Sequence, residues 1–268
     1  MLKQQEHFLI WLAVQVWLVM KAPLKYLLFA WLLILWGENS KGQVIISLLL
    51  GDKLNTGPIE FGLDGGANFS SLEGIKDKAS PGFHIGFYFD IRLKNQWKLH
   101  TGVIVRSPMG ADNIPRYSTG DSSLDHLFTD GEVERNLRYF NVPLMIKYSF
   151  KNRIYAEAGF QLGLINEAVD KFTASIKDKK DLNYEIENKK SYHPIDAGLA
   201  VGAGWRIMKG YGMNIGVRYY LGLIDIMVDD AGNNMYNRSF YLAVGIPVGV
   251  GKAKKRQEEK EKEKAGGS

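Results

Sequence analysis

The sequence predicts an all-β fold: an eight-stranded antiparallel up-and-down transmembrane β-barrel with short periplasmic turns and long extracellular loops. Eight segments between residues 57 and 249 alternate apolar and polar residues, their polar positions hold single charges among many glycines, and short and long connections join them in turn. Because lipid cannot satisfy backbone polar groups, the β structure that spans it is a closed sheet, apolar outside and polar inside. A soluble sandwich or lipocalin-like barrel is the alternative.

Alternation defines each strand, because successive side chains of a strand point to opposite faces. The strands are expected at about residues 59–70, 83–93, 97–107, 142–150, 154–164, 195–207, 213–220 and 239–248. In that order, the apolar faces carry Phe61 and Leu63, Phe87 and Phe89, Val103 and Val105, Leu144 and Ile146, Phe160 and Leu162, Leu199 and Val201, Ile215 and Val217, and Leu242 and Val244. These rows form the expected lipid-facing wall.

The connections indicate which end of the barrel is which. Three-residue turns are expected at 94–96, 151–153 and 208–210, and long polar loops at about 71–82, 108–136, 166–193 and 224–237. Short turns at one end and long loops at the other are typical of bacterial outer-membrane barrels, whose short turns face the periplasm. Aromatic residues near both ends predict the two interfacial girdles, with Trp97, Tyr148, Phe150, Trp205 and Tyr211 beside the turns and Phe69, Tyr139, Tyr192, Tyr219, Tyr236 and Phe240 toward the loops.

The amino-terminal segment predicts export. Lys21 and Lys25 precede an apolar run from 26 to 36, and Ser40 and Gly42 form a small-x-small cleavage site. We expect a signal peptide over 1–42 with its true start at Met20, a short periplasmic segment over 43–56, the barrel over 57–249, and a charged low-complexity periplasmic tail over 250–268. The alternative is one uncleaved anchor that spans both amino-terminal apolar runs.

Several strands also carry a family resemblance. The stretches YFNVPLMIKYSF (139–150), RIYAEAGFQLGLI (153–165), DAGLAVGAGWRI (196–207), MNIGVRYYLGL (213–223) and NRSFYLAVGIPV (237–248) resemble the small outer-membrane β-barrel family of Bacteroidota, the PorT-like or porin-family barrels. The resemblance implies an outer-membrane location and eight strands. PorT itself is an accessory of type IX secretion, a duty that the residues of this chain do not indicate.

The polar faces predict a charged network inside the barrel. Its expected members are Glu60, Asp64, His84, Asp90, Arg92, His100, Arg106, Lys147, Glu157, Asp196, Arg206 and Arg218. Pairing through the short turns places Asp90 opposite His100, His84 opposite Arg106, and Lys147 opposite Glu157. Buried charges are usually paired, so we interpret these residues as interior ion pairs. An Asp–His pair that serves a hydrolase is the alternative.

Aspartate and histidine residues in the expected loops are the remaining candidates for metal binding. Asp112, Asp121, Asp125 and Asp130 lack the spacing of an EF-hand and are expected to form a solvated loop, with calcium binding as the alternative. His126 and His193 have no neighbours at metal-ligand spacing, and the chain has no cysteine. We therefore expect no catalytic, cofactor or metal site.

The small size of the barrel sets the functional expectation. The interior of eight strands is just wide enough for side chains to fill it. We expect a non-enzymatic outer-membrane protein, an envelope anchor or partner-binding component acting through its loops or tail. The alternatives are a narrow porin and an outer-membrane hydrolase. Expected partners are outer-membrane lipid and an envelope or secretion-machinery protein; nucleic acid is not expected, because much of the net charge of +5 comes from the mixed-charge tail.

Overall fold

The computed structural model describes residues 58–248 except 130, 177–178, 208–211 and 229–233, and it does not describe the side chains of 175–181. The expected signal peptide, the periplasmic segment at 43–56 and the tail at 250–268 lie outside the described residues. No helix among the described residues is long and apolar enough to cross a membrane.

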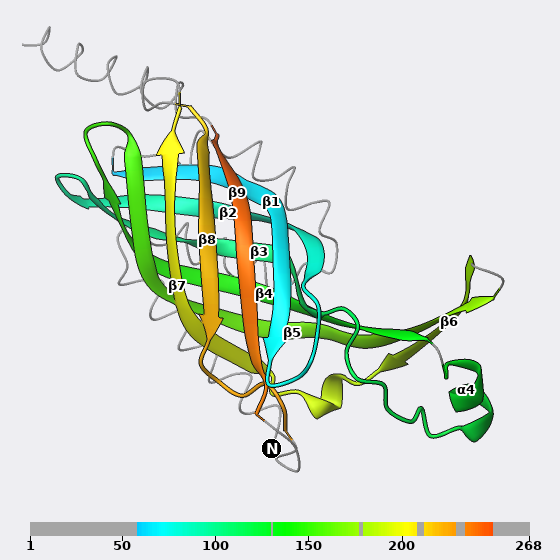
Figure 1. The fold of residues 1–268 in the computed structure, drawn as a ribbon. Coiled ribbons are helices and arrows are strands. Elements are labelled where there is room, and N and C mark those ends of the chain that lie inside the picture. The colour runs from blue at the N-terminus through cyan, green and yellow to red at the C-terminus, as the bar shows by residue number, and fades with distance from the viewer. Residues whose placement is uncertain (1–57, 130, 177–178, 208–211, 229–233, 249–268) are drawn as a thin grey trace, which may run out of the picture. The chain divides into compact units, whose positions relative to one another are not determined.

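The described chain forms one antiparallel sheet of nine strands (Figure 1). The strands are β1 (Ile59–Glu73), β2 (Ser80–Lys94), β3 (Trp97–Ala111), β4 (Glu132–Ser149), β5 (Ile154–Ile176), β6 (Lys179–Glu187), β7 (Ile195–Arg206), β8 (Asn214–Gly222) and β9 (Tyr236–Pro247). Strand β1 pairs with β9, and β4 pairs with β5, so eight strands close into a ring in the order β4-β3-β2-β1-β9-β8-β7-β5. The predicted eight-stranded barrel is confirmed.

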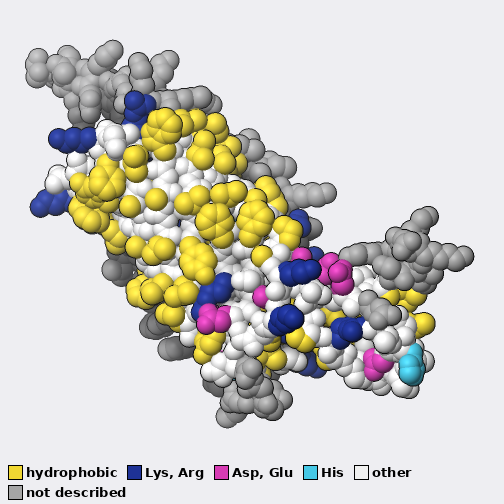
Figure 2. Space-filling model, viewed as in Figure 1, with side chains coloured by type: hydrophobic (Ala, Val, Ile, Leu, Met, Phe, Trp, Pro, Cys, Tyr) yellow, Lys and Arg dark blue, Asp and Glu magenta, His cyan; other side chains and the backbone are white. Residues whose placement is uncertain are grey.

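The two faces of the strands differ as the alternation predicts. Along β5, Phe160, Leu162 and Leu164 are exposed on the outer wall, whereas Glu157 and Gln161 are buried inside. Figure 2 shows the result on one face of the barrel as a broad band of hydrophobic side chains. Exposed apolar side chains on a closed ring form the surface that lipid covers.

Two short turns hold neighbouring hairpins in register. Residues 151–153 form the expected three-residue turn, closed by hydrogen bonds from Phe150 N to Ile154 O (2.8 Å) and from Arg153 N to Phe150 O (3.1 Å). The β2–β3 turn differs, because Lys94 pairs directly with Trp97 and leaves only two residues between them. Asn95 takes a positive φ of 52° in that turn, which an asparagine tolerates. The third turn includes residues outside the described set.

Two expectations about facing are wrong. A register shift between Ile85 and Gly86 leaves Val105 as an extra residue, so Arg106 pairs with Ile85 rather than facing His84. Arg106 is exposed instead of lying inside, because a bulge adds one residue and breaks the alternation beyond it. Tyr139 is buried in the barrel rather than in an aromatic girdle, because the alternation of β4 continues unbroken through it and turns it inward.

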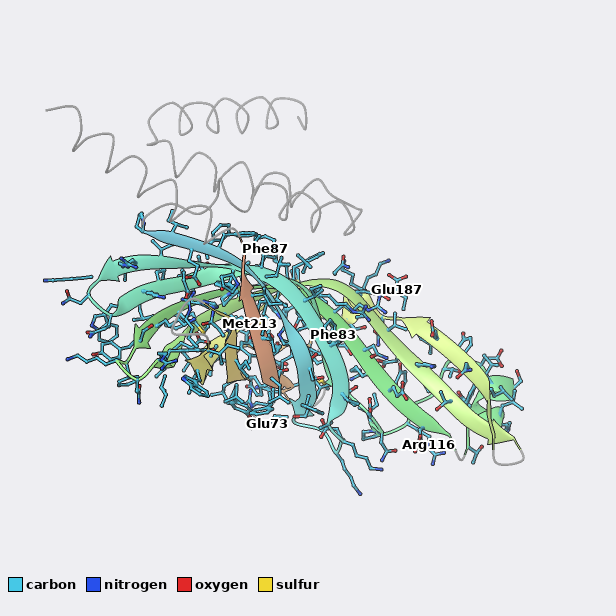
Figure 3. All side chains as sticks on the ribbon, turned by 90° about the horizontal axis from the view of Figure 1, so that it is seen from above. Glu73, Phe83, Phe87, Arg116, Glu187 and Met213 are labelled. Atoms are coloured by element: carbon cyan, nitrogen blue, oxygen red, sulfur yellow. The ribbon has the colours of Figure 1, made fainter. Side chains whose placement is uncertain are left out.

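The loop end holds more regular structure than the sequence predicts. The expected loop at 166–193 is a hairpin in which β5 continues beyond the ring and β6 returns beside it, and the short helix η1 (Lys189–Ser191) comes after β6. The expected loop at 108–136 contains helix α4 (Ser122–Leu127) and the ends of β3 and β4. Figure 3 shows Arg116 and Glu187 on this projecting part, which we call the lobe (112–131 and 166–191).

The topology prediction is tested by labelling single cysteines. Asn95→Cys and Asn152→Cys lie in the short turns, and Ser122→Cys and Lys190→Cys lie in the lobe. Because short turns face the periplasm in barrels of this kind, an impermeant maleimide on intact cells should label only the two lobe positions. Lysed cells, in which all four should react, provide the control. Labelling of the turns alone on intact cells would invert the topology.

Candidate functional site

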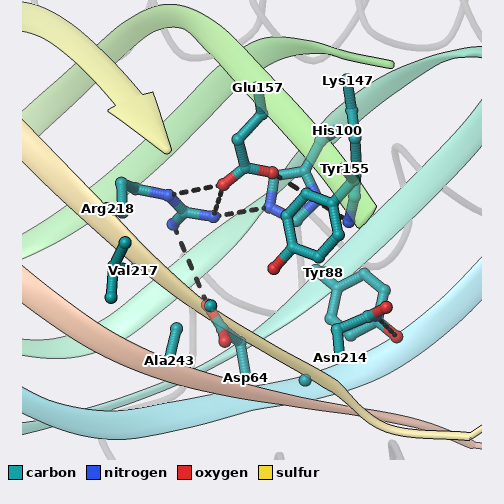
Figure 4. A pocket seen from close by; sticks show the side chains of 12 residues that line it. Asp64, Tyr88, His100, Lys147, Tyr155, Glu157, Asn214, Val217, Arg218 and Ala243 are labelled. Atoms are coloured by element: carbon teal, nitrogen blue, oxygen red, sulfur yellow. Dashed lines mark hydrogen bonds and ion pairs between the residues drawn. The ribbon is translucent and has the colours of Figure 1, made fainter. Parts of the chain in front are cut away.

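Ionisable side chains from six strands meet inside the half of the barrel nearer the short turns, and Figure 4 shows all of them except Asp90. They are Asp64 on β1, Asp90 on β2, His100 on β3, Lys147 on β4, Glu157 on β5 and Arg218 on β8. All six are buried. We call this group the interior network.

Asp90 is held from three directions. One carboxylate oxygen lies 2.7 Å from His100 Nδ1, and the other accepts a hydrogen bond from Lys147 Nζ at 3.1 Å. Lys98 Nζ lies 3.7 Å from the same second oxygen. The expected pairing of Asp90 with His100 across the β2–β3 hairpin is confirmed by their register.

Arg218 connects opposite walls of the barrel. Its Nε and one terminal nitrogen donate to Glu157 Oε1 at 3.1 and 2.8 Å, and the same terminal nitrogen lies 3.1 Å from His100 Nε2. Its other terminal nitrogen is 4.0 Å from Asp64. An arginine only donates hydrogen bonds, so His100 Nε2 accepts, and His100 carries its proton on Nδ1 and donates it to Asp90.

These contacts form a closed cycle through five side chains. It runs from Asp90 to His100, Arg218, Glu157 and Lys147, and back to Asp90. Lys147 is opposite Glu157 in register as expected, but their charged atoms are 4.0 Å apart, so Arg218 is the closer partner of Glu157. The space left among these side chains is about 20 Å³, room for about one water molecule.

A second ion pair lies beside the network. Arg206 donates to Glu60 at 2.7 Å, and Tyr88 Oη donates to the other oxygen of Glu60 at 3.2 Å. Asn214 in turn donates to Tyr88 Oη at 3.3 Å. Tyr88 and Asn214 were not among the expected members, although the alternation also marks both as inward.

Inward glycines make room for these large side chains. A Cβ atom on Gly204 or Gly216 would overlap the Tyr155 hydroxyl, and a Cβ on Gly62 would overlap the Tyr88 ring. Tyr155 in turn presents its ring to Lys147 Nζ, 4.1 Å from the ring centroid. The pairing of small residues with large ones lets charged side chains fill a narrow barrel.

The remaining expected members lie elsewhere. His84 is buried against Tyr241, with ring centroids 5.1 Å apart, and Asp196 accepts a hydrogen bond from Asn237 at 2.9 Å. Arg106 and Arg92 are exposed, which contradicts their expected inward positions. Arg92 lies at the register shift beside the short turn, beyond the buried side chains of the network.

The network does not have the arrangement of a hydrolase triad. Both ring nitrogens of His100 are engaged, by Asp90 and Arg218, so neither faces a nucleophile. The described side chains around the small cavity include no serine, threonine or cysteine. Within the described part of the chain, no group of three or more His, Cys, Asp or Glu residues is arranged to hold a metal ion.

The acidic loop at 108–136 uses its carboxylates to fold itself. Asp121 caps α4 by accepting from Ser123 N at 2.9 Å. Asp125 accepts from Ser118 Oγ at 2.6 Å and from Thr119 N at 2.8 Å, and these hydrogen bonds lower the pKa of its carboxyl. Asp112 lies in a backbone bridge with Lys78, and Asp130 is outside the described residues.

Another buried ion pair, between Arg135 and Asp170, ties the lobe to the barrel. The sequence pattern did not reveal it because both residues fall within expected loops. Arg135 on β4 donates to Asp170 on β5 through two nitrogens, at 2.9 and 2.6 Å. Tyr117 Oη donates to Asp170 at 2.7 Å, and burial raises the pKa of this hydroxyl. Asn188 also donates to Asp170, at 3.1 Å.

The lobe carries an open cavity of about 380 Å³. Its lining consists of Arg116, Tyr117, Ser118, Thr119, Asp125, Phe128, Thr129 and Phe172. The Tyr117 and Phe128 rings pack edge-on to Phe172, at 5.2 and 5.9 Å. The cavity therefore combines an aromatic floor with exposed hydroxyl and guanidinium groups, the composition of a small binding site.

Comparison with known proteins gives one family and several similar solved structures. The family model described as "Outer membrane protein beta-barrel domain" matches residues 50–228. The attachment invasion locus protein Ail of Yersinia pestis is 13% identical with a TM-score of 0.36, over 70% of this chain and 97% of that one. Neisserial surface protein A is 14% identical with a TM-score of 0.33, over 71% of this chain and 97% of that one. OprG from Pseudomonas aeruginosa is 10% identical with a TM-score of 0.32, over 70% of this chain and 93% of that one. No curated protein matches the chain significantly.

Removing one charge from the network should destabilise the barrel. Lys147→Met leaves the buried Asp90 without its closest cation and should lower the free energy of unfolding by roughly 3 to 5 kcal/mol. The measurement is the midpoint of the heat-induced gel shift. Adding Asp90→Asn should recover part of the loss, since an amide oxygen still accepts from His100.

Two further variants make the Lys147 test specific. Adding Glu157→Gln to Lys147→Met should recover nothing, because it strips Arg218 of its main partner. Arg106→Met removes an exposed cation outside the network and should leave the midpoint unchanged. Equal midpoints for wild type and Lys147→Met would contradict a tightly paired interior.

Proposed function

The chain belongs to the outer membrane protein β-barrel domain family and is a protein of the bacterial outer membrane, and from this we propose that it is a non-enzymatic anchored binding protein. In this proposal the barrel is the anchor and the lobe is the surface that binds a partner in the cell envelope. The observation that carries the proposal is the contrast between a filled barrel interior and an open, firmly held cavity in the lobe.

The filled interior favours an anchor over a narrow porin. The interior network joins β2, β3, β4, β5 and β8 across the ring and leaves a space of about 20 Å³. Farther toward the loops, the interior is occupied by buried apolar and aromatic side chains, among them Leu137, Tyr139, Met145, Tyr220 and Tyr241. A solute path through the barrel would have to displace both layers.

The geometry around His100 favours binding over catalysis. A hydrolase needs an imidazole nitrogen free to take a proton from a nucleophile. Both nitrogens of His100 are engaged in the interior, and the cavity beside it admits about one water molecule. We therefore assign the charges of the network to structure rather than to chemistry.

The lobe has the properties of a preformed binding surface. Bidentate pairing of Arg135 with Asp170 fixes the extended ends of β4 and β5, and Asp170 also fixes Tyr117. The Tyr117 ring is 41% exposed at the cavity while its hydroxyl is held. A rigid aromatic side chain loses little conformational entropy on binding, which favours partner recognition.

Blocking the cavity should remove the partner while leaving the barrel folded. Arg116→Glu combined with Thr129→Tyr reverses a charge and adds bulk in the cavity, yet keeps the Tyr117–Asp170 hydrogen bond. Proteins captured by mild cross-linking in native membranes should include a reproducible envelope partner with wild type and lose it with this variant. Lys190→Glu combined with Asn183→Tyr makes the same chemical changes elsewhere on the lobe and should retain it.

Two outcomes count against this proposal. Capture of the same partner by wild type and the cavity variant would remove the cavity from the binding surface. Absence of any reproducible partner from wild type, in membranes where the barrel is folded by gel shift, would contradict the anchored binding role.

A further inference from the structure

The short-turn end of the barrel is rimmed by exposed cations. Arg92, Lys94, Lys151 and Arg153 are all exposed, and we call them the basic rim. Among the described residues of this end, the carboxylates are already engaged: Glu60 is bound by Arg206 at 2.7 Å, and Asp90 is buried in the network. On the face visible in Figure 2, Lys and Arg side chains lie beyond the upper left edge of the hydrophobic band.

The cations belong to one continuous surface. Ser149 N donates to Gln96 O at 3.0 Å, which joins the β2–β3 turn to the end of β4. Arg206 N donates to Arg153 O at 3.0 Å, which joins the β4–β5 turn to the end of β7. The two turns therefore lie side by side, as the neighbouring hairpins of Figure 1 show.

An aromatic ladder lies next to the rim on the outer wall. The Trp97 and Tyr148 rings are 4.7 Å apart, and the Tyr148 and Phe150 rings are 4.8 Å apart. Trp97 and Phe150 remain 48% and 47% exposed. Exposed Trp and Tyr side chains at the end of an apolar band lie at the level of the lipid headgroups. Lys151 is the next residue after Phe150, so the rim is level with the headgroup phosphates.

The loop end differs in its charge pairing. There the outward cations Arg138 and Arg238 are paired with Glu167 and Glu73. A paired cation attracts a phosphate weakly, whereas a cluster of unpaired cations attracts it by about 1 kcal/mol per Lys or Arg near the surface. At the short-turn end, by contrast, no rim cation forms an ion pair with another described residue.

We propose that the basic rim binds the phosphate groups of anionic phospholipids in the leaflet at the short-turn end. The guanidinium groups of Arg92 and Arg153 suit bidentate contact with phosphate, and the two lysines add point charges. The aromatic ladder holds the barrel at the depth where these contacts form. This lipid site is independent of partner binding at the lobe, which lies at the other end of the strands.

Tryptophan quenching by brominated lipids tests the proposal. In the full chain with Trp11, Trp17, Trp31 and Trp36 changed to phenylalanine, fluorescence comes only from Trp97 and Trp205, both at the short-turn end. The protein is folded into phosphatidylcholine vesicles that contain one-fifth phosphatidylglycerol, with either lipid brominated. Quenching should report about fivefold preference for phosphatidylglycerol over phosphatidylcholine beside the two tryptophans, the equivalent of ~1 kcal/mol. This enrichment should fall as salt is raised.

Matched variants assign the enrichment to the rim. Arg92→Gln, Lys94→Gln, Lys151→Gln and Arg153→Asn together should abolish it; asparagine is chosen because Arg153 has a φ of 71°. Lys76→Gln, Lys78→Gln, Lys189→Gln and Lys190→Gln remove the same charge at the loop end and should preserve it. Gel shift confirms folding, and the salt dependence of wild type tests the electrostatics without any rim substitution.

Three results would overturn the proposal. These are quenching by the two lipids in proportion to their one-to-four abundance in wild type, enrichment that is insensitive to salt, and enrichment that survives the rim substitutions but disappears in a chain ending at Val248. The last result would assign lipid binding to residues 249–268 instead.

Discussion

Closure of a narrow ring is the constraint on which the rest of this structure depends. Once β4 pairs with β5 and β1 with β9, inward side chains of opposite strands must occupy the same small interior. A charge in that interior is costly unless it meets an opposite charge, since an unpaired buried charge costs several kcal/mol. Arg218 satisfies this condition by reaching Glu157 and His100 across the barrel, and Glu60 and Arg206 satisfy it beside the network.

Closure of the ring also gives the two halves of the barrel different contents. The half nearer the turns is filled by the interior network. The half nearer the loops is filled by buried aromatic and apolar side chains together with polar ones such as Gln161 and Asn237, and the Arg135–Asp170 pair fixes the lobe beyond it. The surfaces that we propose for partner and lipid binding therefore lie at the two ends. The lobe offers an aromatic cavity, and the short-turn end offers the basic rim beside its aromatic ladder.

The local sequence pattern predicted the strands and the hairpin partners, but it did not predict the contacts between strands that are distant in the sequence. Short turns fix register, so the Asp90–His100 and Lys147–Glu157 pairings are obtained by counting along two hairpins. The cross-barrel contacts of Arg218 depend on how the ring closes, which no local pattern encodes. Arg106 was misplaced because the extra residue Val105 at a bulge reverses the facing of the residues beyond it. Tyr139 was misplaced because β4 begins before the expected strand and its unbroken alternation turns Tyr139 inward. The β5–β6 hairpin was missed because charged residues interrupt its apolar row.

An interior filled by side chains is the central feature of this account, and single-channel recording in a planar lipid bilayer tests it most directly. Wild-type protein, inserted and verified as folded, should give no steady conductance steps, because a solute would have to displace the interior network and the buried side chains nearer the loops. Reproducible steps whose size scales with salt concentration would contradict the filled interior and would identify the protein as a narrow porin.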